Sequence, residues 1–97
     1  MTKSWNDFHK GVNVIADTYG NDVTICYNGL LAKSGADQVY LHYGFGDHWL
    51  DTSTQIMRKS NRGWEKIIKM KDNNVNFCFK DSANNWDNNN GNNWSIR

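Results

Sequence analysis

The feature that most constrains the fold is a two-residue alternation of apolar and polar side chains, repeated in short runs along a chain of 97 residues. Val23–Tyr27 alternates in this way and ends at Asn28-Gly29, a dipeptide typical of tight turns between strands. No amphipathic pattern with helical spacing competes with these runs. The sequence therefore predicts an all-β protein.

Further runs extend this pattern. In Gln38–Tyr43, alternation places Val39 and Leu41 on one face and His42 on the other. The remaining strands are expected at 55–59 and 64–70 (a hairpin closed by 60–63), at 75–80 and at 94–97, with loops at 30–37 and 81–93. Short strands separated by turn residues are typical of sandwiches. We therefore expect an antiparallel β-sandwich of immunoglobulin-like shape.

The length fits one domain, so we expect residues 1–97 to form a single module. Residues 1–20 are the least regular part, and we expect a linker followed by an edge strand around Val12 and Val14. Cys26 and Cys78 each lie in a strand-like run. Their spacing leaves open whether they form one cross-strand bridge or remain two separate buried thiols.

Charge and hydropathy exclude two classes of partner. The formal net charge is +1, and the basic stretch from Arg58 to Lys71 is interrupted by Glu65, so a groove for nucleic acid is not expected. No stretch approaches the length of a membrane span, and the N-terminus lacks the apolar segment of a signal peptide. Either the protein stays inside the cell, or the chain is one piece of a longer, secreted or cell-surface protein, and we expect the second.

The sequence offers little support for catalysis. Asp47 and Asp51 flank Trp49 and are the nearest candidates for a glycosidase pair of carboxylates. Solvated aspartates in a turn explain them as well, and no nucleophile motif accompanies them. We therefore predict that the chain is not an enzyme and has no catalytic residues.

Metal binding and cofactors are not predicted either. His42 and His48 are separated by a Gly-rich turn that does not have the spacing of a zinc site. The run Asp87–Gly91 resembles part of a calcium loop, but its glycine is misplaced and no bidentate Glu follows.

The aromatic residues are the most informative candidates for function. Among five Trp, Trp64 shares the parity of a predicted buried face, whereas Trp49 and Trp86 lie in polar, loop-like sequence. A single ring of this kind can equally be covered by the protein itself. Two of them beside the outward-facing His42 favour a surface for sugars, whose C–H faces are apolar and whose hydroxyls need the donors and acceptors that Asn supplies.

Several motifs, taken together, resemble the family 25 carbohydrate-binding modules and the related starch-binding domains of starch synthases. The resemblance runs from about Val23 to Trp94 and rests on the segments 27–31, 38–44, 63–65, 76–81 and 85–89. It implies a β-sandwich that binds α-1,4- and α-1,6-linked glucans, such as starch, glycogen and malto-oligosaccharides, without cleaving them. It further implies a platform of His42, Trp49 and Trp86, with Lys80 and Asn88 on its hydrogen-bonding rim.

The sequence also allows two other functions besides glucan binding. The exposed Trp side chains of an immunoglobulin-like cell-surface module could meet a protein partner, because binding hot spots also favour Trp. The Asn- and Asp-rich surroundings of Trp86 favour a sugar instead. A small glycosidase fragment is the second alternative, and it would release reducing sugar.

Overall fold

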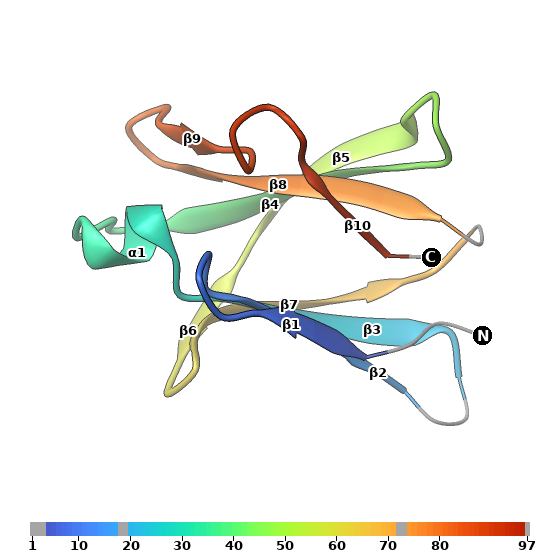
Figure 1. Ribbon diagram of the computed structural model, residues 1–97, viewed down its shortest axis with the longest axis horizontal. Helices are drawn as coiled ribbons and strands as arrows, with labels where there is room; N and C mark the ends of the chain where they lie inside the picture. Colours follow the sequence, from blue (N-terminus) through green and yellow to red (C-terminus); the bar gives the residue numbers. More distant parts are fainter. Residues whose placement is uncertain (1–3, 18–19, 72–73, 97) are drawn as a thin grey trace.

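Two antiparallel sheets lie face to face in the computed structural model, which describes residues 4–17, 20–71 and 74–96 (Figure 1). The only helix in this described part is α1 (Leu30–Lys33). The predicted all-β sandwich is therefore confirmed.

The first sheet, called sheet A here, contains five strands, all paired antiparallel. Their order across the sheet is β1 (Trp5–Asp7), β2 (Val12–Ala16), β3 (Asp22–Tyr27), β7 (Gly63–Lys69) and β6 (Arg58–Ser60). The expected strand around Val12 is present, but it is an inner strand. β1 forms the edge, within a segment that the sequence placed in a linker.

The second sheet, called sheet B, is formed by the C-terminal half and the middle of the chain. Its strands run in the order β10 (Trp94–Ile96), β8 (Val75–Asp81), β4 (Val39–Phe45) and β5 (Leu50–Ile56), and β9 (Trp86–Asp87) also pairs with β8. β4, β8 and β10 lie where strands were expected, whereas only the end of β5, at 55–56, lay in a predicted strand. β9 was missed because a two-residue strand inside Asn-rich sequence has no periodicity to detect.

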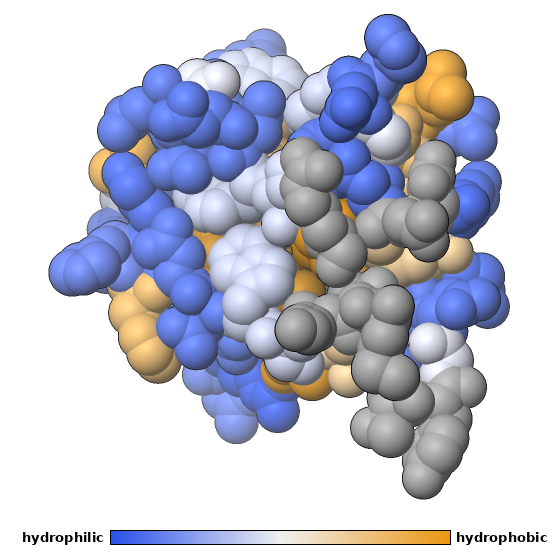
Figure 2. All heavy atoms as spheres, turned by 45° about the vertical axis from the view of Figure 1, so that its right-hand side comes forward, coloured by the Kyte–Doolittle hydropathy of each residue, from blue (hydrophilic) through white to orange (hydrophobic). Residues whose placement is uncertain are grey.

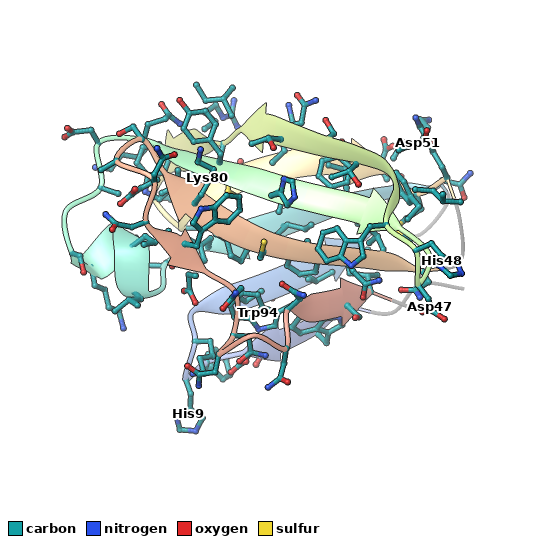
Figure 3. All side chains as sticks on the ribbon, turned by 90° about the horizontal axis from the view of Figure 1, so that it is seen from above. His9, Asp47, His48, Asp51, Lys80 and Trp94 are labelled. Atoms are coloured by element: carbon teal, nitrogen blue, oxygen red, sulfur yellow. The ribbon has the colours of Figure 1, made fainter. Side chains whose placement is uncertain are left out.

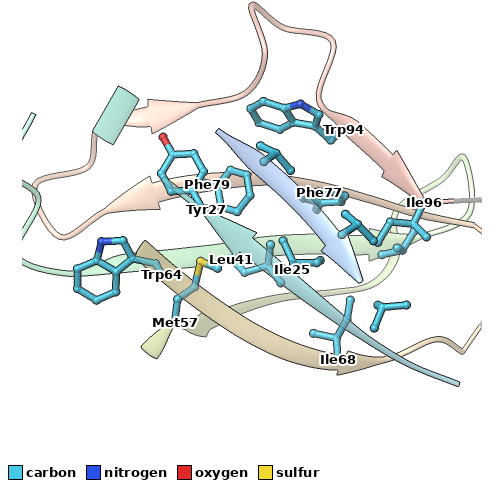
Figure 4. Close-up of a cluster of buried hydrophobic side chains, with 14 of the residues drawn as sticks. Ile25, Tyr27, Leu41, Met57, Trp64, Ile68, Phe77, Phe79, Trp94 and Ile96 are labelled. Carbon is cyan, nitrogen blue, oxygen red and sulfur yellow. The ribbon is translucent and has the colours of Figure 1, made fainter. Parts of the chain in front are cut away.

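The core fills the space between the sheets, as the close-up in Figure 4 shows. Tyr27 from sheet A stacks on Phe79 from sheet B with ring centroids 4.1 Å apart. Trp94 closes one side of the core, where its ring stacks on Phe77 and its Nε1–H donates to the Asp7 carboxylate at 3.2 Å. Alternating strand residues thus produce one shared interior, since every second side chain of both sheets points inward.

The chain changes sheets at Met57. The sequence predicted one continuous strand over 55–59, but β5 ends at Ile56 in sheet B and β6 begins at Arg58 in sheet A. The side chain of Met57 is buried, and its backbone N–H donates to the Val39 carbonyl at 2.9 Å. Alternation within a single run cannot show which sheet each half joins, so only the 58–60 part of the predicted hairpin pairs with β7.

Cys26 and Cys78 are free and buried, which excludes the cross-strand bridge that the sequence left open. Cys26 lies on β3 in sheet A, and Cys78 lies on β8 in sheet B. Each alternates with core residues of its own strand, so the two thiols belong to opposite outer faces. Burial raises the pKa of both thiols, that of Cys78 to about 11.

Candidate functional site

The outer face of sheet B carries two rows of side chains set by strand register. Tyr40 and His42 alternate with the buried Val39 and Leu41, so both point away from the core. Residues paired across antiparallel strands point to the same face. One row therefore contains Thr54, His42 and Cys78, and the next contains Ile56, Tyr40, Lys80 and Trp86.

Gly44 occupies the next outward position on β4, and it has no side chain to place there. A Cβ on Gly44 would lie 2.8 Å from the Cα and 2.9 Å from the Cβ of Trp49. The Trp49 side chain, which comes from the following turn, lies against this glycine. The missing side chain at position 44 thus makes room for a ring that continues the line of Tyr40 and His42.

The turn that delivers Trp49 has an unusual backbone. Trp49 and Asp51 both adopt left-handed conformations, with φ of 53° each, which cost non-glycine residues on the order of 1 kcal/mol or more. The Thr52 hydroxyl donates to the Trp49 carbonyl. The pairing of β4 with β5 shifts register between Tyr43 and Phe45, so β5 has one extra residue there. Such bulges redirect side chains at sheet edges.

His42 lies between the two tryptophan rings. Its ring centroid is 5.8 Å from that of Trp49, with the planes 27° apart, and 5.4 Å from that of Trp86, with the planes 86° apart. Trp86 is 48% exposed, whereas Trp49 is less accessible. We call His42, Trp49 and Trp86 the aromatic surface. Because the Trp86 ring stands almost perpendicular to the His42 ring, this surface is bent rather than flat.

Trp86 is held in place from below by its neighbour Asp87. The Tyr27 hydroxyl donates to the Asp87 carboxylate at 2.6 Å and accepts from the Leu31 backbone N–H at 3.0 Å. All of these groups are buried. Burial, followed by the hydrogen bond to Asp87, raises the pKa of Tyr27, so this phenol stays protonated. A buried residue of sheet A thereby anchors the strand that presents Trp86.

The loop before Trp86 is ordered by Asp81. Its carboxylate accepts hydrogen bonds from the Asn85 side chain at 3.0 Å, the Asn85 backbone N–H at 2.8 Å and the Ala83 backbone N–H at 3.0 Å. These bonds, led by those from Asn85, lower the pKa of the carboxyl group. These hydrogen bonds therefore fix the shape of the short loop that connects β8 to β9.

Lys80 lies between two rings on the outer face, and Figure 3 shows its position on β8. Its Nζ is 5.4 Å from the ring centroid of Trp86 and 5.8 Å from that of Tyr40. The same ammonium group donates to the Asn84 side-chain oxygen at 2.9 Å. A cation above an aromatic face is attracted by the ring electrons, so Lys80 stabilises the orientation of Trp86.

The electrostatics of the site keep His42 neutral. Burial, together with the positive charge of Lys80, lowers the pKa of His42 below its ordinary value of 6.5. Its Nδ1 lies 2.8 Å from the Thr54 hydroxyl in the neighbouring strand. A neutral imidazole fixed by one nitrogen leaves the other nitrogen to donate or accept a hydrogen bond toward the surface.

The structure brings together some of the site residues that the sequence predicted. His42, Trp49, Trp86 and Lys80 come together on one face, although they are separated along the chain. Asn88 is instead engaged in its own loop, where its side-chain oxygen accepts from the Gly91 N–H at 2.9 Å. Sequence reasoning missed Asn84, Thr54 and Gly44. Thr54 lies just before the predicted strand 55–59, so no predicted alternation pointed it outward.

Other candidate groups do not form a second cluster. Asp47 and Asp51 are exposed near the turn after β4, beside His48 (Figure 3), and Asp47 accepts a hydrogen bond from the Asn74 side chain at 3.2 Å. In the described part of the chain, no three His, Cys, Asp or Glu side chains gather as a metal site would require. No helix among those residues is long and apolar enough to cross a membrane.

The surface at the end of the sandwich nearest the termini has a mixed character. Figure 2 shows hydrophilic side chains spread over this end, with apolar atoms in small areas between them.

Comparison with known proteins identifies the group to which this chain belongs. The model of the starch/carbohydrate-binding module family 53 matches residues 23–77, more than half of the chain. The chain is 40% identical over 95 residues to an alpha-amylase of Clostridium acetobutylicum, a match that covers 91% of this chain but only 12% of that protein. No solved structure matches the chain significantly. The motifs pointed to family 25, and the comparisons support the broader group of starch-binding modules. The chain belongs to the starch/carbohydrate-binding module family 53.

Proposed function

We propose that the chain binds starch-like α-glucans on the outer face of sheet B, at the aromatic surface of His42, Trp49 and Trp86. The observation that carries the proposal is the gathering of these three rings on one exposed face in a chain of a starch-binding family. A carbohydrate-binding module is a non-catalytic domain, so the expected event is adsorption without cleavage.

The bend of the aromatic surface favours a curved ligand. Trp49 and His42 lie nearly parallel, while the plane of Trp86 is 86° from that of His42. An α-linked glucan winds helically and turns successive sugar faces in different directions, whereas a β-1,4-glucan is straight and flat. A bent set of rings therefore complements α-linked chains such as starch, glycogen and malto-oligosaccharides.

Polar groups around the rings supply the remaining contacts. Lys80 and His42 lie on the same face as Trp86, and the Lys80 ammonium and the His42 nitrogen not used by Thr54 can bind sugar hydroxyls. We include Asn88 through its side-chain amide, although its oxygen is already used within the loop. An open site of this kind loses much of its contact energy to desolvation and ordering, so we expect dissociation constants from roughly micromolar to millimolar.

The biological role follows from the size of the module. The chain spans 12% of the amylase that it matches, and we propose that it is likewise one module, residues 1–97, of a larger secreted or cell-surface protein. Adsorption to the polysaccharide would raise the local concentration of an attached enzyme or surface protein on starch.

Titration of intrinsic Trp fluorescence with maltoheptaose tests the proposal, with a cello-oligosaccharide of equal length as the control. We expect a saturable change with the α-glucan alone, since Trp86 is half exposed and would be covered by a bound sugar. If folded protein responds to neither sugar, glucan binding at this face is refuted, and a protein partner for the exposed rings becomes the better explanation.

A further inference from the structure

The outer face of sheet B continues beyond the aromatic surface. Tyr40 is two residues before His42 on β4, so its side chain points to the same side, on the order of 7 Å further along the strand. Strand register places Ile56 on one side of Tyr40 and Lys80 on the other. The aromatic surface and this second row therefore form a continuous face.

We propose that Tyr40 forms a further subsite for α-glucan, one that longer chains reach and short oligosaccharides do not. This inference rests on the proposed function, because Tyr40 would bind the continuation of a chain already held by Trp49, His42 and Trp86. The occupant is a glucose residue whose apolar face packs on the phenol ring. Ile56, which is 56% exposed, extends the apolar contact at the edge of the sheet.

Lys80 links the two parts of the face. Its Nζ is 5.8 Å from the centroid of Tyr40 and 5.4 Å from that of Trp86, so both rings lie around one cation. The ammonium group is thereby positioned to donate to hydroxyls of a sugar chain that passes from Trp86 to Tyr40. Its bond to the Asn84 side chain at 2.9 Å limits how far it can move.

The composition of this row favours a sugar as the occupant. It combines a phenol, a cation and one branched aliphatic side chain, which matches a ligand with apolar faces and a hydroxylated rim. Tyr40 is half-buried, so a sugar would cover the remaining exposed part of its ring without a change in the strand.

The experiment compares the affinities for maltoheptaose and maltotriose by calorimetry, in the unmodified chain and in Tyr40→Ala and Tyr40→Phe. We expect Tyr40→Ala to reduce the affinity for maltoheptaose roughly threefold to tenfold, the range for loss of one aromatic stacking contact. The affinity for maltotriose should change less, so the ratio of the two affinities falls. Tyr40→Phe keeps the ring and should keep the ratio.

Ile67→Ala is the matched control, because Ile67 is 60% exposed on the opposite outer face, in sheet A. Equal losses for both sugars in Tyr40→Ala would overturn the subsite and show that Tyr40 only supports Lys80. An unchanged ratio with full binding would also overturn it, while leaving the proposed function intact. If the unmodified chain binds neither sugar, the proposed function itself fails. Circular dichroism of each variant establishes that it is folded.

Discussion

The two outer faces of the sandwich arise from the same alternation of residues but present different chemistry. On sheet A, strand register lines up Arg58, Glu65, Cys26, Asn13 and Asn6 in one row. Arg58 and Glu65 form an ion pair at 2.9 Å, and Ile67 is an exposed apolar side chain opposite Thr24. On sheet B, the corresponding rows hold Tyr40, His42, Lys80 and Trp86.

The difference shows where the proposed binding face acquires its Trp rings. The polar row of sheet A comes entirely from regular strand positions. On sheet B, Trp49 arrives from a turn with left-handed backbone, and Trp86 begins a strand of two residues anchored by Asp87. Regular alternation also places the His42 ring on sheet B, and irregular segments laid over that sheet add the two Trp rings of the proposed binding surface.

The largest difference between the two faces is expected when Trp86 is mutated. Trp86→Ala should weaken maltoheptaose binding by about 2 kcal/mol or more, because the most exposed ring of the aromatic surface is lost. Ile67→Ala removes an exposed apolar side chain from the other face and should leave affinity unchanged. Calorimetry measures both. Equal affinity in the Trp86→Ala variant and the unmodified chain would refute the assignment of the binding face.

Gly44→Ala tests whether Trp49 depends on the empty position beneath it. The new Cβ would come within 2.9 Å of the Trp49 Cβ, so the turn must shift, and we expect a loss of about 2 kcal/mol in stability together with weaker binding. Urea unfolding and calorimetry report the two effects. In a Trp49→Ala background, Gly44→Ala should no longer change affinity, since the displaced ring is absent. An additive loss of affinity would contradict this account.

Tyr27→Phe tests how far a buried residue of sheet A positions Trp86 on the outer face of sheet B. It removes the hydroxyl that binds the buried Asp87 and Leu31, and we expect about 1–3 kcal/mol less stability in urea unfolding. Affinity for maltoheptaose should also fall, because Asp87 adjoins Trp86. Loss of stability with full affinity would mean that Trp86 is positioned without this anchor.

The smallest effect concerns pH. The pKa of His42 lies below 6.5 in the folded chain, so the unfolded chain binds protons more readily as the pH falls past that value. The contribution of His42 to stability is therefore present above pH 6.5 and is lost between 6.5 and the lower folded pKa. His42→Gln should flatten this part of the pH profile of thermal unfolding. His9→Gln, at an exposed position outside the face, should not.

Sequence reasoning recovered most of the fold and named several residues that the structure brings together in the candidate site, for identifiable reasons. The strands around Val23, Val39 and Val75 were predictable because their alternation is regular. The change of sheet at Met57 was not, since both halves of that run alternate equally well. His42 and Trp86 were singled out by parity and by their polar neighbours. That they meet depends on the register of β4, β8 and β9, which one sequence does not specify.

Gly44 shows most clearly what could not be predicted from the sequence. A glycine in a strand signals a bulge or a close approach, but the identity of the approaching group is a tertiary fact. Asn88 illustrates the reverse case. The family resemblance implied that Asn88 contacts ligand, and the structure adds that its side-chain oxygen stabilises the turn at Gly91.

The seating of Trp49 against Gly44 also bears on how such a module can diversify. The ring belongs to a connection between strands, so mutation, insertion or deletion within 46–49 can replace it without altering the pairing of β4 with β8. The paired strands of the sheet can then stay the same while the connection between β4 and β5 varies in sequence and length. Grafting other aromatic or polar loops at this point offers a route to modules that recognise different polysaccharides.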